Sequence, residues 1–318
     1  MKVCIVGTGV IGSIYGQQMS RSGHQVVHLV RRLDDPRVRD GFEIRLLDGR
    51  MQPASENGSY YRPTAIDALD ATQRFDLILA SVRHDRLEAL LPVLAAGRGS
   101  ADVLLFGGRW EGLEPVDAVL GRGSYLWGYP VAGGGFRDDV LDAALLGDVH
   151  LGEPVVTDGR RLEGVSGLFR SVGLTVDVPS DILSWLVVHF AIEAGIIGAA
   201  IAAGDPDGFL DSTEWLTEGI LAVRDALAVV QARGISVEAA PDAQVFFAPA
   251  DMVAAGIREQ YQVDLAARKI MTRHTGREEL GRIFGDVLAT ARALGVSTPV
   301  LDRLEPAVDA YASVAAVS

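Results

Sequence analysis

The stretch Val-Cys-Ile-Val-Gly-Thr-Gly-Val-Ile-Gly, residues 3–12, decides the fold of this chain. An apolar run ends at Gly7, and Gly7, Gly9 and Gly12 then give the spacing G-x-G-x-x-G. The first glycine of such a pattern permits a tight turn, the second lets backbone N–H groups approach a pyrophosphate, and the third lets the helix lie close to the strand. The stretch therefore predicts a strand, a dinucleotide-binding turn and a helix, in that order.

The residues after the glycines support this interpretation. Residues 14–22 have the pattern of an amphipathic helix, Gly23 is placed to end it, and residues 25–30 form a second apolar strand. The N-terminus of the helix would offer unpaired N–H groups and a partial positive charge to phosphates. An ordinary glycine-rich turn is the alternative, and the strand–helix–strand context favours the dinucleotide site over it. The residues expected to contact the dinucleotide are Gly7, Thr8, Gly9, Val10, Ile11 and Gly12.

The end of the second predicted strand indicates which dinucleotide binds. In NAD-binding proteins an acidic residue about 20 positions after the glycines binds the ribose 2′-hydroxyl. Arg31 and Arg32 occupy that position here, and a guanidinium can form two parallel hydrogen bonds to the 2′-phosphate of NADP. Asp34 and Asp35 keep NAD open as an alternative, and a solvated pair of surface arginines is another. We predict NADP as the cofactor.

The composition limits the classes of partner. The 318 residues carry a net charge of −13 with no basic stripe, which argues against nucleic acid and anionic membranes as partners. The single cysteine, Cys4, lies in the first predicted strand and cannot form an internal disulfide, which favours a reducing compartment. That strand begins at Lys2, so no signal peptide fits before it. We expect a cytoplasmic protein that binds a small-molecule substrate.

The most apolar stretch, residues 182–203, contains His189, Glu193 and three glycines. It is long enough to cross a bilayer. A buried central helix is nevertheless the simpler interpretation beside a complete nucleotide-binding fold, since ionisable residues are rare in membrane spans. We therefore expect no membrane contact.

Strands and helices alternate through the first third of the chain. Strands are predicted over residues 42–47, 60–64, 75–82 and 102–106, with a turn at Asp48-Gly49 and a helix over 85–96. This alternation indicates a doubly wound α/β sheet, in which ligands bind beyond the carboxyl ends of the strands. The residues that follow such ends, and are candidates for the cleft, are Arg83, Gly107, Gly108, Arg109 and Trp110.

From about residue 181 the pattern becomes helical. Ser212, Gly234 and Gly295 are placed as helix caps. The best boundary is Val178-Pro179-Ser180, so we predict a Rossmann-like NADP-binding domain over residues 1–178 and an all-helical domain over 179–318 for substrate binding and a possible homodimer. The predicted helices of the second domain are 182–203, 212–233, 249–274, 278–294 and 299–317.

With these motifs in place, the chain resembles the ketopantoate reductase family, the 2-dehydropantoate 2-reductases that use NADPH. The family shows the same glycine fingerprint and an arginine that matches Arg31. Further matching segments are Val82-Arg83, Phe106-Gly107-Gly108, Gly276-Arg277-Glu278-Glu279 and Gly295-Val296-Ser297-Thr298-Pro299. The resemblance implies an NADPH-dependent reductase whose cofactor contacts include Arg83, Gly107 and Glu279.

The chain departs from the family at the catalytic positions. Trp185 aligns with a family tryptophan, which places the family's general-acid lysine at Val187 and its two asparagines at Ala191 and Gly195. A further asparagine is replaced by Gly107, and the family's substrate-binding serine has no clear match in residues 267–271. The resemblance thus implies that the cofactor half of the pattern is kept and the catalytic half is largely replaced.

Hydride transfer to a carbonyl creates an alkoxide, which needs a proton donor that Val187 cannot provide. His189 is the attractive substitute, with Glu193 one helical turn later to orient it. However, residues two apart on a helix point roughly 200° away from each other. If Val187 faces the nicotinamide, His189 faces the core, so a buried structural pair with Glu193 is favoured. Lys269 and His274 are further candidate donors, with a solvated helix face as the alternative, and Arg109 could bind a substrate carboxylate or cap a loop.

Two functions follow. The first is an NADPH-dependent reductase that acts on a small carbonyl or imine with an altered proton donor. The second is a protein that binds NADP without hydride transfer, as a sensor or as a scaffold for non-redox chemistry. We favour the reductase, because the cofactor motifs are intact beside an open helical domain.

Overall fold

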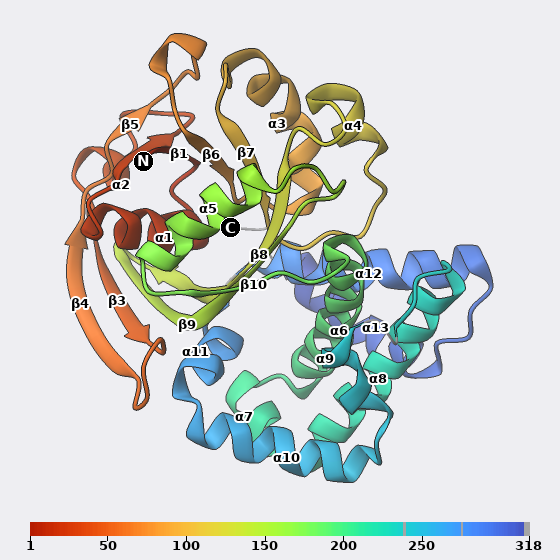
Figure 1. Ribbon diagram of the computed structural model, residues 1–318. Coiled ribbons are helices and arrows are strands. Elements are labelled where there is room, and N and C mark those ends of the chain that lie inside the picture. The colour runs from red at the N-terminus through yellow and green to blue at the C-terminus, as the bar shows by residue number, and fades with distance from the viewer. Residues whose placement is uncertain (238–239, 275, 315–318) are drawn as a thin grey trace. The chain divides into compact units, whose positions relative to one another are not determined.

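The computed structural model describes residues 1–237, 240–274 and 276–314 (Figure 1). The chain forms two compact units, one of Met1–Gly107 with Glu111–Ile182 and one of Gly108–Trp110 with Leu183–Ser318. The boundary after Ile182 lies four residues beyond the predicted one. The three residues Gly108–Trp110 join the second unit although they directly follow a strand of the first. Each unit has a hydrophobic core of its own.

A mixed sheet forms the centre of the first unit, with the strand order β4-β3-β9-β8-β7-β6-β1-β2-β5 and β10 paired with β9. Strands β7, β6, β1 and β2 are neighbours and parallel, as the doubly wound prediction requires. The predicted α/β class with a C-terminal helical part is therefore confirmed. The strands are β1 (Lys2–Val6), β2 (Gln25–Leu29), β3 (Phe42–Asp48), β4 (Ser55–Tyr61), β5 (Ala65–Ile66), β6 (Leu77–Ala80), β7 (Asp102–Phe106), β8 (Leu126–Arg137), β9 (Val140–Gly152) and β10 (Thr175–Asp177).

The strands next to the glycine fingerprint are buried because they are apolar on both faces. Every residue of β6, Leu-Ile-Leu-Ala, is buried, as is expected of a parallel strand covered on both sides. The helix after the fingerprint ends as predicted, with Gly23 at φ +84°. The helices of this unit are α1 (Val10–Arg21), α2 (Pro36–Arg39), α3 (His84–Gly97), α4 (Glu114–Leu120) and α5 (Arg160–Ser171), with a 3₁₀ turn at Ala71–Gln73.

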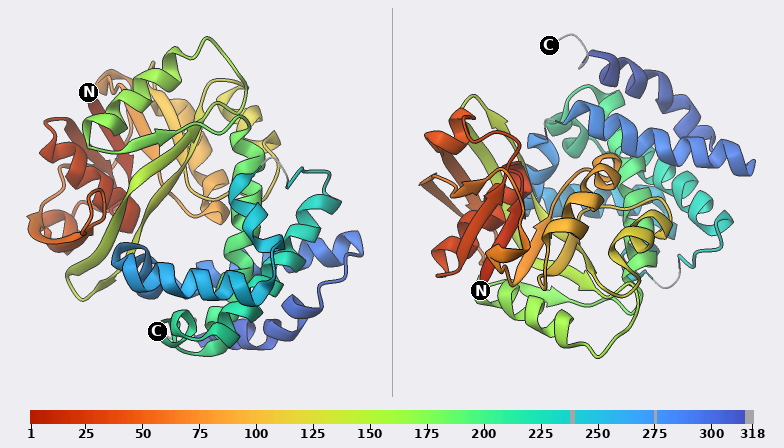
Figure 2. Two further views of the ribbon diagram at one scale, coloured as in Figure 1. Left: turned by 60° about the horizontal axis from the view of Figure 1, so that its bottom comes forward. Right: turned by 90° about the horizontal axis from the view of Figure 1, so that it is seen from above.

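Strands β8 and β9 form a long antiparallel hairpin (Figure 2). The sequence analysis does not predict this hairpin. Strand β8 contains Pro130 and three consecutive glycines, residues that ordinarily argue against a strand. The glycines have a structural reason, because a Cβ atom on Gly134 would lie 2.3 Å from the carbonyl oxygen of Asp142 on β9. The predicted strand over 60–64 is also misplaced, since β4 ends at Tyr61.

The second unit is all-helical, and its caps lie where the sequence places them. Ser212 accepts a hydrogen bond from the Trp215 amide at 3.2 Å, and Gly234 and Gly295 end their helices with positive φ. The helices are α6 (Ile182–Ala203, whose first residue belongs to the first unit), α7 (Pro206–Asp211), α8 (Thr213–Ala232), α9 (Pro241–Gln244), α10 (Ala250–Val263), α11 (Leu265–Arg273), α12 (Arg277–Leu294) and α13 (Pro299–Ser313), with a 3₁₀ turn at Val245–Phe247.

Two helix predictions need correction. The single helix predicted over 249–274 is wrong, because Asp264 ends α10 and its carboxylate accepts a hydrogen bond from the Ala267 amide at 2.9 Å, which begins α11. The short helix α7 is absent from the prediction. Residues 315–317, predicted to end the last helix, lie outside the described residues.

Helix α6 is long and apolar enough to cross a membrane by length and composition, and half of its most apolar window is buried. The core helix of a soluble protein passes the same test. Within the second unit, α6 meets α8 at Gly195, where a Cβ would lie 2.5 Å from the Val223 amide nitrogen. It meets α12 at Gly198, where a Cβ would lie 2.5 Å from the ring of Phe284. These contacts identify the core face of α6.

Candidate functional site

The glycine fingerprint has the geometry that a pyrophosphate needs. Gly7 has φ +83°, which only glycine adopts without strain. Gly12 lies so close to the strand that a Cβ there would be 3.1 Å from the Gly7 carbonyl oxygen. At Gly9, in contrast, a Cβ would meet nothing within 4 Å. The turn is therefore packed tightly beneath and open above Gly9, where a ligand can approach the backbone.

The N-terminus of α1 is prepared for an anion. Gly9 is the N-cap and supplies no side-chain cap, and the first turn has no acidic residue. The first N–H groups of a helix have no partner within the helix. Those of Val10, Ile11 and Gly12, with the partial positive charge of the helix end, match the phosphates expected there.

Arg31 and Arg32 follow β2 but have different partners. Arg32 donates two hydrogen bonds of 2.9 Å to Asp34, and both side chains are largely exposed. In the described part of the chain, Arg31 makes no hydrogen bond or ion pair. Asp35 is engaged as well, because its carboxylate accepts a hydrogen bond from the Arg37 amide at 3.0 Å and caps α2. Of these two arginines, Arg31 is therefore the one whose guanidinium is available to a ligand.

The parallel strands bring the predicted cofactor residues to one edge. Gly7, Arg31, Arg83 and Gly107 follow the carboxyl ends of the neighbouring strands β1, β2, β6 and β7. The Arg83 guanidinium donates to both carboxylate oxygens of Asp85, at 3.0 and 2.8 Å. Gly107 is fixed by β8, since its N–H donates to the Gly128 carbonyl and its carbonyl accepts from the indole of Trp127, each at 2.9 Å.

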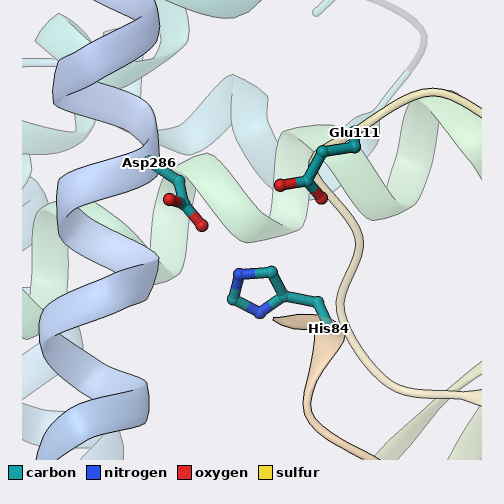
Figure 3. A group of neighbouring side chains, drawn as sticks. All are labelled: His84, Glu111 and Asp286. Atoms are coloured by element: carbon teal, nitrogen blue, oxygen red, sulfur yellow. The ribbon is translucent and has the colours of Figure 1, made fainter. Parts of the chain in front are cut away.

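Two titratable residues at the same edge escaped the sequence analysis. His84 begins α3 after β6, and Glu111 lies in the loop after β7; ligand atoms of the two are within 4.8 Å of each other (Figure 3). Their positions after the carboxyl ends of two adjacent strands are the signal that could have identified them. Asp286, also drawn in Figure 3, comes from α12 and so belongs to the helical unit.

The orientation of α6 reverses the expectation about the proton donor. Val187 and Ala191, which align with the family's lysine and first asparagine, are 2% and 0% exposed and belong to the helical core. Gly195, at the second asparagine position, packs against the backbone of α8. The positions inferred from Trp185 therefore face inward, and a donor there would be buried among apolar side chains.

His189 and Glu193 lie on the opposite face and are partly exposed, whereas the sequence analysis favours a fully buried pair. The His189 ring stacks on Trp185 with centroids 4.7 Å apart and planes 11° apart, and the Trp185 indole donates to Asp242 at 3.2 Å. A Cβ on Gly108 would lie 3.8 Å from the Glu193 carboxylate. This face is the one part of α6 that presents titratable groups.

The other candidate donors lie at α11 and the start of α12. Lys269 is partly exposed on α11, whose neighbouring Arg268 anchors the helix to α7 through Asp207 and Asp211. The His274 Nε2 atom is 3.6 Å from the Glu279 carboxylate, and its Nδ1 atom accepts from the Gly276 amide at 3.1 Å. Glu279, expected at the cofactor, is thus within ion-pair distance of His274.

Trp110 is a core residue of the helical unit and not a cleft residue. It stacks on Phe190 with centroids 5.4 Å apart, and the Arg233 guanidinium covers its ring at 4.4 Å. Its indole donates to Thr290 at 2.8 Å. Arg109 beside it is buried, with 9% of its surface exposed. These contacts explain why Gly108–Trp110 belongs to the second unit.

The N-terminal part of the chain matches a known protein family. Residues 3–137 match the family model "Ketopantoate reductase PanE/ApbA". The match covers the fingerprint, Arg31, Val82-Arg83 and Gly107, so the resemblance inferred from these residues is confirmed over this range. No curated protein has a significant match to the sequence.

Solved structures extend the likeness to the whole length. The 2-dehydropantoate 2-reductase of Geobacter metallireducens GS-15 is 18% identical with a TM-score of 0.70, covering 98% of this chain and 99% of that one. A putative ketopantoate reductase of Ralstonia solanacearum MolK2 is 17% identical with a TM-score of 0.68, covering 100% and 99%. D-mandelate dehydrogenase with NADH and anilino(oxo)acetate is 15% identical with a TM-score of 0.72, covering 100% of both chains. At these identities the likeness shows a shared fold.

Proposed function

We propose that this protein is an NADPH-dependent reductase of the ketopantoate reductase type that reduces the carbonyl of a small 2-oxo acid. The observation that carries the proposal is the edge formed by β7, β6, β1 and β2, where the open fingerprint and Arg31 follow adjacent strands. The named relatives supply the substrate class, because 2-dehydropantoate and mandelate are both carboxylic acids oxygenated at carbon 2.

The residues present fit a dinucleotide phosphate. The open backbone at Gly9 and the uncapped start of α1 suit the pyrophosphate, and Arg31 suits a 2′-phosphate. The carboxylates of Asp34 and Asp35, which would favour NAD, are occupied by Arg32 and by the α2 N-cap. When bound, the reduced nicotinamide supplies a hydride to the carbonyl carbon of the substrate.

His189 is the proposed proton donor to the developing alkoxide, and Glu193 the residue that orients it. Their spacing of four residues equals that between the family's lysine and first asparagine, shifted by two residues onto the partly exposed face of α6. Glu193 can stabilise the imidazolium form of His189. The chain runs from Gly107 directly to Gly108, beside which the Glu193 carboxylate lies. Lys269 is the competing donor.

One assay tests the function. NADPH oxidation is followed at saturating cofactor with ketopantoate, phenylglyoxylate and an aliphatic 2-oxo acid, and binding of NADPH and NADH is measured separately. We expect NADPH to bind and at least one 2-oxo acid to be reduced. Tight NADPH binding without turnover of any carbonyl or imine would favour the alternative, an NADP-binding protein without hydride transfer, which the missing lysine supports.

A further inference from the structure

A buried histidine lies directly beneath the fingerprint turn. His28, on β2, has none of its surface exposed. Its Nδ1 atom is 2.8 Å from the carbonyl oxygen of Gly7, and its Nε2 atom is 2.8 Å from the hydroxyl oxygen of Tyr61 on β4. Both ring nitrogens are therefore engaged, one of them by the first glycine of the fingerprint.

The chemistry of the partners fixes the tautomer. A carbonyl oxygen can only accept a hydrogen bond, so Nδ1 carries the hydrogen and donates it to Gly7. A neutral imidazole has one donor and one acceptor, so Nε2 accepts from the Tyr61 hydroxyl. Burial lowers the pKa of His28, which keeps the ring in this neutral form.

The two peptide groups that meet at Gly7 are consequently both held by β2. The Gly7 N–H donates to the Leu29 carbonyl at 2.8 Å, while the Gly7 carbonyl accepts from His28. The peptide bond is planar, so a fixed Gly7 carbonyl also fixes the direction of the Thr8 N–H, which points the opposite way. Thr8 is the second residue of the phosphate-binding turn.

The sequence leaves room for this arrangement at one position of α1. A Cβ on Gly16 would lie 2.7 Å from His28 Nε2 and 2.9 Å from the Tyr61 hydroxyl oxygen. Gly16 stands outside the G-x-G-x-x-G pattern, and the approach of the two side chains accounts for it. Tyr61 is 8% exposed and its ring makes an edge contact with Phe42, with centroids 5.9 Å apart.

We propose that His28 is a positioning residue for the cofactor: it orients the Gly7–Thr8 peptide toward the pyrophosphate, and Tyr61 holds its imidazole in place. The inference rests on the proposed function, because it takes a dinucleotide as the ligand of the turn. An apolar residue of similar size at position 28 would fill the space but leave the Gly7 carbonyl without its donor.

Three variants separate this role from simple packing. His28→Asn places an amide where Nδ1 lies and can still donate to Gly7, whereas His28→Leu cannot; Tyr61→Phe removes the hydroxyl from the far side of the ring. His150→Asn, on β9 of the same unit, is the matched control. NADPH affinity is measured by calorimetry, turnover at saturating NADPH by absorbance, and folding by thermal melting.

We expect NADPH affinity to fall about tenfold in His28→Leu and roughly threefold in Tyr61→Phe, and to stay within about threefold of wild type in His28→Asn. Turnover at saturating NADPH should be unchanged in all of them. Equal affinity of wild type and His28→Leu, or a His28→Asn protein as weak as His28→Leu, would overturn the inference. If His28→Leu does not fold, an unchanged affinity in Tyr61→Phe overturns it instead. A wild-type protein that binds no dinucleotide would overturn the proposed function as well, which distinguishes the two failures.

Discussion

Adjacent arginines with different partners make a matched pair for testing cofactor choice. Arg31 has no partner in the described chain, while Arg32 is held by Asp34. We expect Arg31→Ala to weaken NADPH binding by roughly ten- to a hundredfold, the cost of losing hydrogen bonds to a charged group, and to leave NADH binding unchanged. Arg32→Ala should weaken NADPH binding less than Arg31→Ala does. Calorimetric titration of both dinucleotides decides this, and equal affinity of wild type for NADPH and NADH would contradict it.

His189 offers a second prediction at the scale of one residue. Replacing a general acid typically lowers the rate by about 10² to 10⁴. His189→Gln should therefore lose turnover by that order while retaining NADPH affinity, and its melting temperature should change little because the side chain is partly exposed. Lys269→Met serves as the comparison. Loss of turnover in Lys269→Met alone would move the proton donor to α11.

The pKa of His28 gives a pH dependence of stability. Burial lowers its pKa from the ordinary value of 6.5, so below pH 6.5 the unfolded chain binds a proton that the folded chain does not. The contribution of neutral His28 to the free energy of unfolding is therefore fully present above pH 6.5. It falls as the pH drops toward the lowered pKa of the folded protein, by up to about 1.4 kcal/mol per pH unit. The free energy of unfolding, measured with urea at several pH values between 7.5 and 5.5, should change less steeply with pH in His28→Asn than in the wild type. The same pH dependence of the unfolding free energy in both proteins would show that other groups, such as His24, determine it.

At the scale of elements, α6 shows what a sequence pattern can and cannot predict. The buried strands, the glycine turn and most helix ends followed from local signals such as Gly23, Ser212 and Gly295. Which face of α6 points inward did not follow from the sequence, because apolar residues surround most of the helix and His189 and Glu193 are its only titratable groups. Contacts of Gly195 and Gly198 with other helices decide it. The β8–β9 hairpin was missed for a similar reason, since its glycines serve a close strand contact that only the pairing reveals.

The buried face of α6 leads to a prediction about Val187. This side chain is 2% exposed among apolar neighbours, so Val187→Lys must bury an ammonium without a partner. We expect the variant to lose roughly 3–5 kcal/mol of stability and to gain no ketopantoate reduction. Val187→Ile is the control for added volume. A folded Val187→Lys protein with increased reductase activity would contradict this and show that position 187 faces the substrate, as the alignment at Trp185 implies.

The break between α10 and α11 depends on one side chain. Asp264 caps α11 through the Ala267 amide. Removing such a cap costs about 0.5–2 kcal/mol. Asp264→Ala should lower the free energy of unfolding by this amount, and Asp264→Asn, which retains an oxygen acceptor, should lower it less. Equal losses in the two variants would indicate that the carboxylate charge, and not the cap, is what matters.

At the scale of the whole molecule, two hydrophobic cores without a shared residue predict separate responses to the cofactor. The residues proposed to hold the pyrophosphate and the 2′-phosphate all lie in the first unit, with the sheet, whereas Trp110 and the inner face of α6 belong to the helical core. A ligand at 100 times its dissociation constant stabilises the species that binds it by about 2.7 kcal/mol. Saturating NADPH should therefore slow hydrogen exchange in β1, β2, β6 and β7 by up to about a hundredfold. Amides of α8 and α12 should change much less. Equal slowing in both units would instead mean that the two units unfold together as one cooperative body, although each has a hydrophobic core of its own.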